Sequence, residues 1–395
     1  MELEAVGRWD EAFFGRFAGL GEALQAGRPG ALAGSVADFR VLFGDGSPFG
    51  SMLRWEALLV CASPGGPPLA RLIVSANRLA AAPCLACGWL ACRADSPEAA
   101  ALLFQRAEAQ ARAWGCPVLK APLQGHFMHS YRLKLPGGGD PFHGEPDDDP
   151  LQHRLLQEAG FEVTGRWDTI RIDPTRTLLN FERIRRSLTR RTTSYAQVRT
   201  RPVRLWRWEE DLRIVYDLIS SAYTQMPEFE PVTWEAFRLL GESFRYVIHP
   251  LSSFIFEYRG EPVGFAICYF DPLPVLQQRA AGRGLVPALR ARLPALLADL
   301  VGPRLADLET LVRLKLNSRR LLLAYVGRVE PRDGARIQGV QSLVSRPLYF
   351  LAKLLRTDDI LVTYLAAGSA SRKSYDQRFV TIHSSYVLYG KQPAS

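Results

Sequence analysis

Arginine is concentrated in one stretch of this 395-residue chain. The formal net charge is +9, and residues 171–208 hold eleven arginines against two acidic residues, which accounts for the whole excess. A guanidinium group binds phosphates and carboxylates through a planar fork of N–H donors. A local stripe of such groups therefore favours an anionic partner more than an evenly spread charge would. The alternative interpretation is a solvated basic helix that joins two domains.

Two pairs of side chains have the spacing of metal ligands. Cys84 and Cys87 are separated by two residues, and so are His126 and His129. The cysteine pair has no second cysteine pair or nearby histidine to complete four ligands, and the histidine pair has no third ligand, so we predict no metal site. The six cysteines are too few for a disulfide scaffold in so long a chain, and residues 84–92 have the composition of a buried strand.

A histidine near the C-terminal end is a candidate general base. His383 lies in the expected strand 379–389, where alternation places it on the same face as Thr381 and Ser385. An imidazole that faces a cleft can take a proton from an ammonium group near neutral pH. A structural histidine with satisfied hydrogen bonds is the other interpretation.

The composition is that of a globular protein with two domains. Hydrophobic residues make up 47% of the chain and charged residues 23%, and no apolar run is long enough to span a membrane. Glu2 and Glu4 stand where a signal peptide would carry basic residues. We therefore expect a cytoplasmic protein with no membrane partner.

The expected elements follow the same order in both halves of the chain. In the first half we expect a helix, strands, a helix capped by Asp95-Ser-Pro97, then strand, helix and strand, over 9–24, 57–62, 69–75, 84–92, 97–114, 118–121, 150–159 and 161–172. In the second half we expect two helices, a hairpin, a helical insertion, then strand, helix, strand, short helix and strand, over 210–223, 233–242, 254–258, 263–270, 285–301, 319–329, 343–355, 359–366, 371–377 and 379–389.

The two hairpins indicate an internal duplication. Residues 66–73 and 260–267 align without gaps in their turn placement and apolar alternation. The predicted fold class is α/β, with a mixed sheet in each of two units. We predict a first domain over 1–175, a basic linker over 176–204 and a second domain over 205–395.

Several segments resemble the GNAT N-acyltransferases, and the whole chain resembles bacterial proteins with two GNAT units in tandem. The likeness is carried by Asp95-Ser-Pro-Glu-Ala-Ala-Ala-Leu-Leu103, Leu155-Leu-Gln-Glu-Ala-Gly-Phe161, Glu261-Pro-Val-Gly-Phe-Ala266 and Gly339-Val-Gln-Ser-Leu343. The resemblance implies two tandem GNAT-like units. The first half lacks a phosphate-binding pattern, so we expect its unit to be degenerate.

The resemblance also implies a site for acyl-CoA in the second half. GNAT enzymes hold the pyrophosphate on the backbone N–H groups of a helix N-terminus, usually at the pattern Arg/Gln-x-x-Gly-x-Gly/Ala. The best match is Arg336-Ile-Gln-Gly339-Val-Gln341, in which Gln341 replaces the second glycine. The predicted binding residues are Val329, Arg332, Arg336, Gln338, Gly339, Val340 and Gln341. A packing turn that no longer binds CoA is the alternative.

The same resemblance implies roles for side chains around that turn. Tyr375, shortly before Phe379, corresponds to the tyrosine that protonates the leaving thiolate. His383 and Glu330 are the candidate general bases. The loop after the first helix of the second unit often lines the acceptor pocket, and here it supplies Tyr223, Glu228 and Phe229.

Three functions remain open from the sequence. The first is transfer of an acyl group from acyl-CoA to the primary amine of a small molecule by direct attack, with no permanently bound cofactor. The second uses an aminoacyl-tRNA as donor, held by the basic 183–207 segment, in which Arg183, Arg186 and Arg190 share one helical face. The third is a non-catalytic binding protein with this fold.

Overall fold

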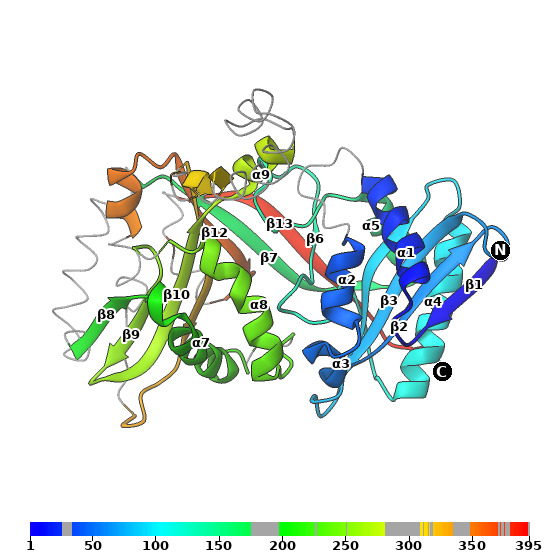
Figure 1. Ribbon diagram of the computed structural model, residues 1–395, viewed down its shortest axis with the longest axis horizontal. Coiled ribbons are helices and arrows are strands. Elements are labelled where there is room, and N and C mark those ends of the chain that lie inside the picture. The colour runs from blue at the N-terminus through cyan, green and yellow to red at the C-terminus, as the bar shows by residue number, and fades with distance from the viewer. Residues whose placement is uncertain are drawn as a thin grey trace, which may run out of the picture. The chain divides into compact units, whose positions relative to one another are not determined.

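The computed structural model describes residues 1–25, 34–174, 197–224, 226, 228–249, 251–280, 309–310, 312–314, 316, 319–334, 348–369, 372, 375 and 380–393 (Figure 1). By its contacts the chain forms two compact units. Unit 1 comprises Met1–Trp167, Thr224–Phe237 and Ser384–Ser395, and unit 2 comprises Asp168–Tyr223 and Arg238–His383. Each unit therefore contains chain from both halves of the sequence.

Unit 1 contains helices and strands that alternate along the first half of the chain. They are β1 (Glu2–Val6), α1 (Glu11–Gln25), α2 (Val36–Phe43), α3 (Pro48–Met52), β2 (Leu53–Cys61), β3 (Pro68–Asn77), β4 (Leu85–Cys92), α4 (Pro97–Trp114), β5 (Leu119–Ala121), β6 (Leu133–Lys134) and α5 (Pro150–Glu158). Strand β7 (Glu162–Ile172) begins in unit 1 and ends in unit 2, whereas β13 (Val380–Lys391) runs from unit 2 into unit 1.

Local signals define the ends of the helices in unit 1. Pro97 opens α4, and Gly115 ends it in the left-handed conformation at φ 69°. Asp149 caps α5 by accepting hydrogen bonds from the backbone N–H groups of Leu151 and Gln152. Pro97, Gly115 and Asp149 act as the sequence predicted, and both helices lie where they were expected. The polar cap expected before Pro97 is not formed, because the Ser96 side chain makes no capping hydrogen bond.

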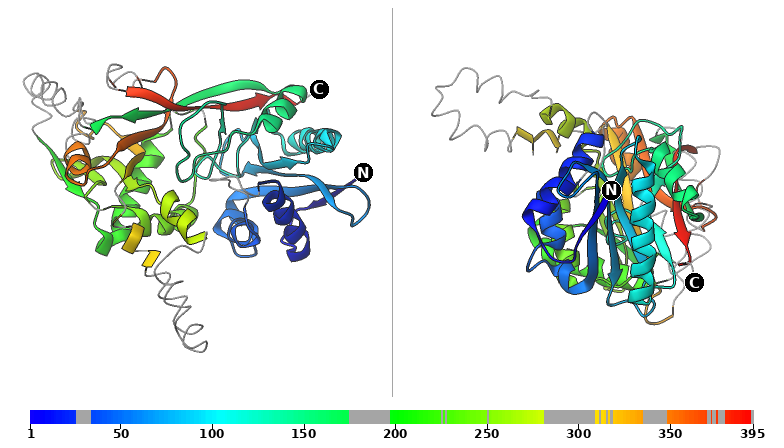
Figure 2. Two further views of the ribbon diagram at one scale, coloured as in Figure 1. Left: turned by 90° about the horizontal axis from the view of Figure 1, so that it is seen from above. Right: turned by 90° about the vertical axis from the view of Figure 1, so that its right-hand side faces the viewer.

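The sheet of unit 1 buries a different helix layer on each face. Its strand order is β1-β2-β3-β4-β5-β13-β7, with β6 also paired to β13. Leu72 and Val74 on β3 face the cluster that includes Leu103 and Ala107 of α4. Arg71, on the opposite face of the same strand, packs against Phe17 of α1. The right-hand view of Figure 2 shows α1 and α4 on the two sides of this sheet.

Unit 2 repeats much of this order. Its elements are β8 (Val198–Pro202), the 3₁₀ helix η2 (Leu205–Arg207), α7 (Trp208–Ala222), α8 (Trp234–Val247, which begins in unit 1), β9 (Phe254–Tyr258), β10 (Glu261–Phe270), α9 (Leu273–Ala280), β11 (Arg320–Arg328) and β12 (Asp359–Ala366). The strand order is β7-β12-β11-β10-β9-β8. Residues 348–354 are helical, and Leu348 and Ala352 pack on the sheet core beside Leu323 and Val362.

The predicted α/β class with two similar units is confirmed. In unit 1, β2 and β3 form an antiparallel hairpin, and the next strand, β4, runs parallel to β5. In unit 2, β9 and β10 form the corresponding hairpin, and the next strand, β11, runs parallel to β12. The segment 84–92 forms the buried strand predicted for it, and all six cysteines are buried free thiols. Strand β8 lies at the C-terminal end of the predicted linker, most of which falls outside the described residues, as does the predicted helical insertion 285–301.

The sequence did not reveal several short elements. Strand β1, helices α2 and α3, and helix α9 were not predicted, because each is only five to eight residues long and shows too little periodicity. Among the described residues no helix is long and apolar enough to cross a membrane.

Candidate active site

The two parallel strands at the centre of unit 2 separate part-way along their length. Strand β11 pairs with β12 from Arg320 opposite Asp359 to Leu323 opposite Val362. Beyond this point β11 continues to Arg328 and β12 to Ala366, with no further pairing between the two within the described residues. We call residues 324–328 of β11 the splayed edge.

The register of β11 on its other neighbour decides which way its backbone groups point. The Val329 N–H donates to the Val263 carbonyl at 3.0 Å, so these residues form a hydrogen-bonded pair of the antiparallel ladder. Such pairs alternate with non-hydrogen-bonded ones, and Val326 opposite Ala266 is one of the latter. The N–H and carbonyl of Val326 therefore point away from β10, toward the β12 side. The Val326 residue is 37% exposed.

An irregularity lies where the two strands part. Ile267 pairs with Tyr325 but Cys268 pairs with Leu323, so Ala324 is an extra residue that makes a bulge in β11. On the β12 side, the Thr363 hydroxyl donates to the Leu323 carbonyl at 3.3 Å. This bond gives a partner to the carbonyl of the last β11 residue that pairs with β12. A bulge bends its strand away from the ladder and thus helps β11 to leave β12.

Tyr223 reaches the splayed edge from the end of α7. Helix α7 packs on β10 and β11, and Tyr223 is its C-terminal cap residue. The Tyr223 hydroxyl donates to the Val326 carbonyl at 3.3 Å. The structure therefore brings this predicted substrate-binding residue to β11, whereas Val326 itself was missed because only the strand register identifies it.

Three predicted residues follow directly after β11. Val329 packs against the core of unit 2, and Glu330 is exposed. The Arg332 side chain is 92% exposed, and its guanidinium forms an ion pair with Glu261 at 3.1 Å. The remaining predicted CoA-binding residues, Arg336, Gln338, Gly339, Val340 and Gln341, lie outside the described residues.

Tyr375 lies against the core of unit 2. It is half-buried and packs beside the cluster formed by the sheet and residues 348–352. Burial, followed by the proximity of Tyr349, raises the pKa of its phenol well above the usual range. The hydroxyl therefore holds its proton more tightly than an ordinary phenol does, and the role of Tyr375 as general acid stays a prediction.

The candidate base His383 is the last residue of unit 2. It lies on β13 and is 8% exposed, whereas Ile382 beside it is 58% exposed. The strand therefore turns an apolar side chain outward and the imidazole inward. Burial does not follow the predicted alternation beyond this pair, because Thr381 is exposed and Ser384 is only 2% exposed. The catalytic role of His383 stays a prediction.

The other predicted acceptor residues belong to a different unit from Tyr223. Glu228 and Phe229 lie in unit 1, where the ring of Phe229 packs on Phe127 with centroids 5.5 Å apart. Their segment is fixed there because His126 Nε2 lies 3.1 Å from the Glu230 carbonyl oxygen. The His126 side chain thus packs inside unit 1, against the segment that carries Glu230.

The corresponding opening in unit 1 is crossed by the chain itself. Strand β4 pairs with β5 only at Leu85 and Ala86, and then the Leu123 N–H donates to the Cys87 carbonyl at 3.0 Å. A Cβ at Gly88 would lie only 2.6 Å from the Leu123 carbonyl oxygen, so the two backbones are in direct contact there. Residues 122–125 therefore lie beside β4 at the position where β11 has no pairing partner within the described residues.

Part of the basic segment is already engaged in ion pairs. The guanidinium groups of Arg201 and Arg204 both bind the fully buried carboxylate of Asp211, at 2.9 and 2.6 Å. Arg207 pairs with Glu210 at 2.8 Å. These arginines hold β8 and η2 to α7, so they are structural; residues 183–191 lie outside the described part of the chain.

Comparison with solved structures shows the fold of tandem GNAT proteins. A tandem GNAT protein from the clavulanic acid biosynthesis pathway is 13% identical, with 100% of this chain and 99% of that chain covered and a TM-score of 0.51. A GCN5-related N-acetyltransferase from Anabaena variabilis is 10% identical, with 100% and 73% covered and a TM-score of 0.51. A conserved protein of unknown function from Enterococcus faecalis, described as a probable N-acyltransferase, is 8% identical, with the same coverage and TM-score.

No family model and no curated protein matches the sequence. The likeness to solved structures, at this low identity, shows the fold and not the reaction. The resemblance to tandem GNAT proteins inferred from the sequence is confirmed at that level.

Proposed function

We propose that the protein is an acyl-CoA-dependent N-acyltransferase and that unit 2 carries its active site. The observation that supports this is the splayed edge, where the Val326 N–H points to the side of β11 that is unpaired within the described residues, while its carbonyl accepts the Tyr223 hydroxyl. An acyl-CoA carries an extended arm with two amide groups, which can pair with a strand edge as a short additional strand would. The acceptor in this proposal is a primary amine of a small molecule.

The reaction is direct attack of the amine on the thioester. The amine nitrogen bonds to the carbonyl carbon, the carbon–sulfur bond breaks, and the thiolate leaves with the electron pair. Tyr375, the tyrosine that the family resemblance places here, gives the thiolate a proton in this proposal. His383 or Glu330 accepts the proton that the amine loses.

The contrast between the units supports placing the reaction in unit 2. In unit 1 the chain at Leu123 closes the space beside β4. The turn before α4 contains no glycine, and the first turn of α4 carries Glu98, an acid that would repel a pyrophosphate. Unit 1 is accordingly proposed to be a degenerate copy.

A proline substitution tests the splayed edge directly. Because Val326 is in a non-hydrogen-bonded pair with Ala266, Val326→Pro removes the open N–H without removing a ladder bond to β10. Val326→Ala is the matched control, since it shortens the side chain and keeps the N–H. Calorimetric titration with acetyl-CoA and longer acyl-CoAs should show binding that is about tenfold weaker in Val326→Pro and nearly unchanged in Val326→Ala.

The two variants also define the results that would contradict the proposal. Equal affinity of both folded variants for acyl-CoA would exclude the splayed edge as the binding site. If the wild-type protein bound aminoacyl-tRNA and no acyl-CoA, the donor would be aminoacyl-tRNA and not acyl-CoA. If the protein bound acyl-CoA but mass spectrometry found no acylated product over a library of amines, it would be a non-catalytic binding protein.

A further inference from the structure

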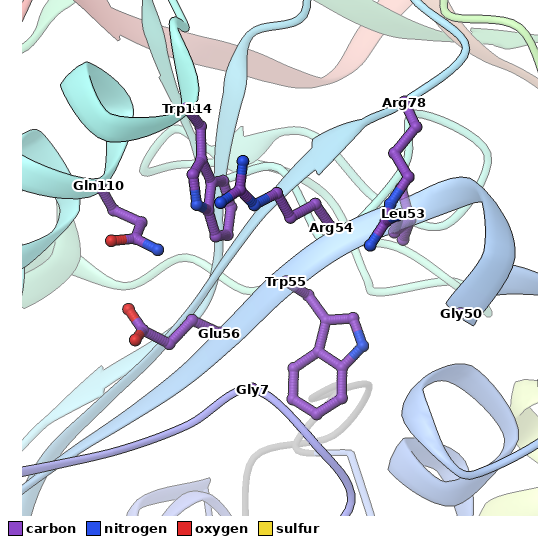
Figure 3. A pocket seen from close by; sticks show the side chains of 9 residues that line it. All are labelled: Gly7, Gly50, Leu53, Arg54, Trp55, Glu56, Arg78, Gln110 and Trp114. Atoms are coloured by element: carbon purple, nitrogen blue, oxygen red, sulfur yellow. The ribbon is translucent and has the colours of Figure 1, made fainter.

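A polar cleft of about 400 Å³ lies in unit 1. All the residues that line it come from the first 114 residues of the chain, and none of them belongs to β11. It is located at the start of β2 and the end of α4 (Figure 3). Strand β1 stops where Val6 pairs with Ala57, but β2 extends back to Leu53. In the part of the chain that the structure describes, the first residues of β2 therefore have no strand partner on this side, and the cleft is found at this edge.

The cleft has an excess of positive charge. Arg54 and Arg78 both line it, and neither forms an ion pair with a carboxylate within the described part of the chain. The one acidic residue in the lining, Glu56, is held by Arg106 through two hydrogen bonds of 2.7 and 3.1 Å. The carboxylate of Glu56 is thus neutralised from outside the lining, and two guanidinium charges remain.

Aromatic side chains hold the cleft in shape. The Arg54 guanidinium lies over the Trp114 indole, 4.7 Å from its centroid, which limits the conformations of Arg54. Trp55 is fixed from behind by Phe14 and Phe43, at centroid distances of 6.0 and 5.0 Å. In Figure 3 the Arg54 guanidinium stands before Trp114, and the Arg78 side chain extends toward Leu53 on the same part of β2.

We propose that this cleft binds a small dianionic ligand, whose carboxylate or phosphate oxygens accept hydrogen bonds from Arg54 and Arg78. Guanidinium groups without a carboxylate partner present planar pairs of N–H donors that match such oxygens. The Gln110 amide, also in the lining, adds a neutral donor that suits an anion of this size. The site is independent of the proposed acyl transfer, because it lies in unit 1 and shares no residue with the splayed edge.

Calorimetric titration distinguishes the two sources of the anion. Inorganic phosphate and succinate are the probes, each at a constant ionic strength set with sodium chloride, since screening weakens exposed charge interactions. The variants are Arg54→Gln and Arg78→Gln. Arg166→Gln is the matched control, since Arg166 is an exposed arginine of unit 1 outside the cleft.

The expected result is saturable binding of one or both probes, weakened about tenfold or more by either cleft variant and unchanged in Arg166→Gln. Phosphate binding alone assigns a phosphate ester, and succinate binding alone assigns a dicarboxylate. Absence of saturable binding of both probes would overturn the proposal. Equal loss in all three variants would also overturn it, because the effect would then come from overall charge. Unfolding temperatures measured without ligand confirm that each variant is folded.

Discussion

The packing of Gly21 against Arg71 allows a sharp test of the core of unit 1. Arg71 is 1% exposed, and its Nη1 donates to the Phe17 carbonyl at 2.7 Å. Its burial lowers the pKa of the guanidinium to about 9. A Cβ at Gly21, inside α1, would lie 2.1 Å from the Arg71 Nη2 atom. Gly21→Ala must therefore displace the buried charge.

The size of the effect follows from three contributions. Displacing the guanidinium breaks a charged hydrogen bond, which costs about 1.5–3 kcal/mol. Overpacking of a filled core costs about 1–3 kcal/mol. Alanine is better than glycine inside a helix by up to about 1 kcal/mol, which partly offsets the loss. We expect Gly21→Ala to lower the free energy of unfolding by about 2–4 kcal/mol.

A double-mutant cycle with Arg71→Met isolates the cause. Methionine is shorter and uncharged, so Gly21→Ala in that background should be neutral or stabilising by up to about 1 kcal/mol. Urea unfolding followed by far-ultraviolet circular dichroism measures all four proteins. The reasoning is refuted if Gly21→Ala has the same effect in both backgrounds, since the clash with the guanidinium would then not be the cause.

Two further predictions concern buried polar groups of unit 1. Tyr386→Phe removes the hydroxyl that donates to the buried Glu145 carboxylate at 2.5 Å, and it should lower the free energy of unfolding by about 1–3 kcal/mol. The control Tyr246→Phe, at a tyrosine that is 55% exposed, should leave the free energy of unfolding almost unchanged. Equal urea midpoints for the two variants would contradict this prediction. Burial lowers the pKa of His126 to about 4 and that of His129 to about 3, so the unfolded chain binds more protons below about pH 6.5. The two histidines therefore do not reduce the free energy of unfolding above that pH. As the pH falls from 8 to 5, each histidine lowers the free energy of unfolding by about 2 kcal/mol. His129→Phe should remove about half of that loss, and an unchanged pH dependence would count against it.

Local sequence signals determined most of the elements and the fold class. Pro97 and Gly115 define the ends of α4, and they do so through backbone geometry that needs no distant partner. The two hairpins were predicted from turn residues and alternation for the same reason. The duplicated order of these elements, together with the family-like segments, was enough to indicate tandem GNAT units.

Features that depend on distant chain segments could not be predicted. The orientation of the Val326 backbone depends on a register with β10 that includes a bulge at Ala324, and no local pattern encodes that register. The location of Glu228 and Phe229 in unit 1 depends on contacts with residues about a hundred positions earlier, such as Phe127. Sequence reasoning grouped them with Tyr223 because the three are neighbours in the chain.

The sequence by itself thus determined most of the longer helices and strands, whereas the tertiary structure decided which of their surfaces are covered. Arg54 and Arg78 belong to no recognisable sequence motif. They line one cleft because β1 ends at Val6, opposite Ala57, and so does not pair with the first four residues of β2. Arg71 is buried by helix α1, which packs across β3. The physical reason is common to these cases: periodicity and caps act over a few residues, but burial and strand edges depend on pairings between residues far apart in the chain.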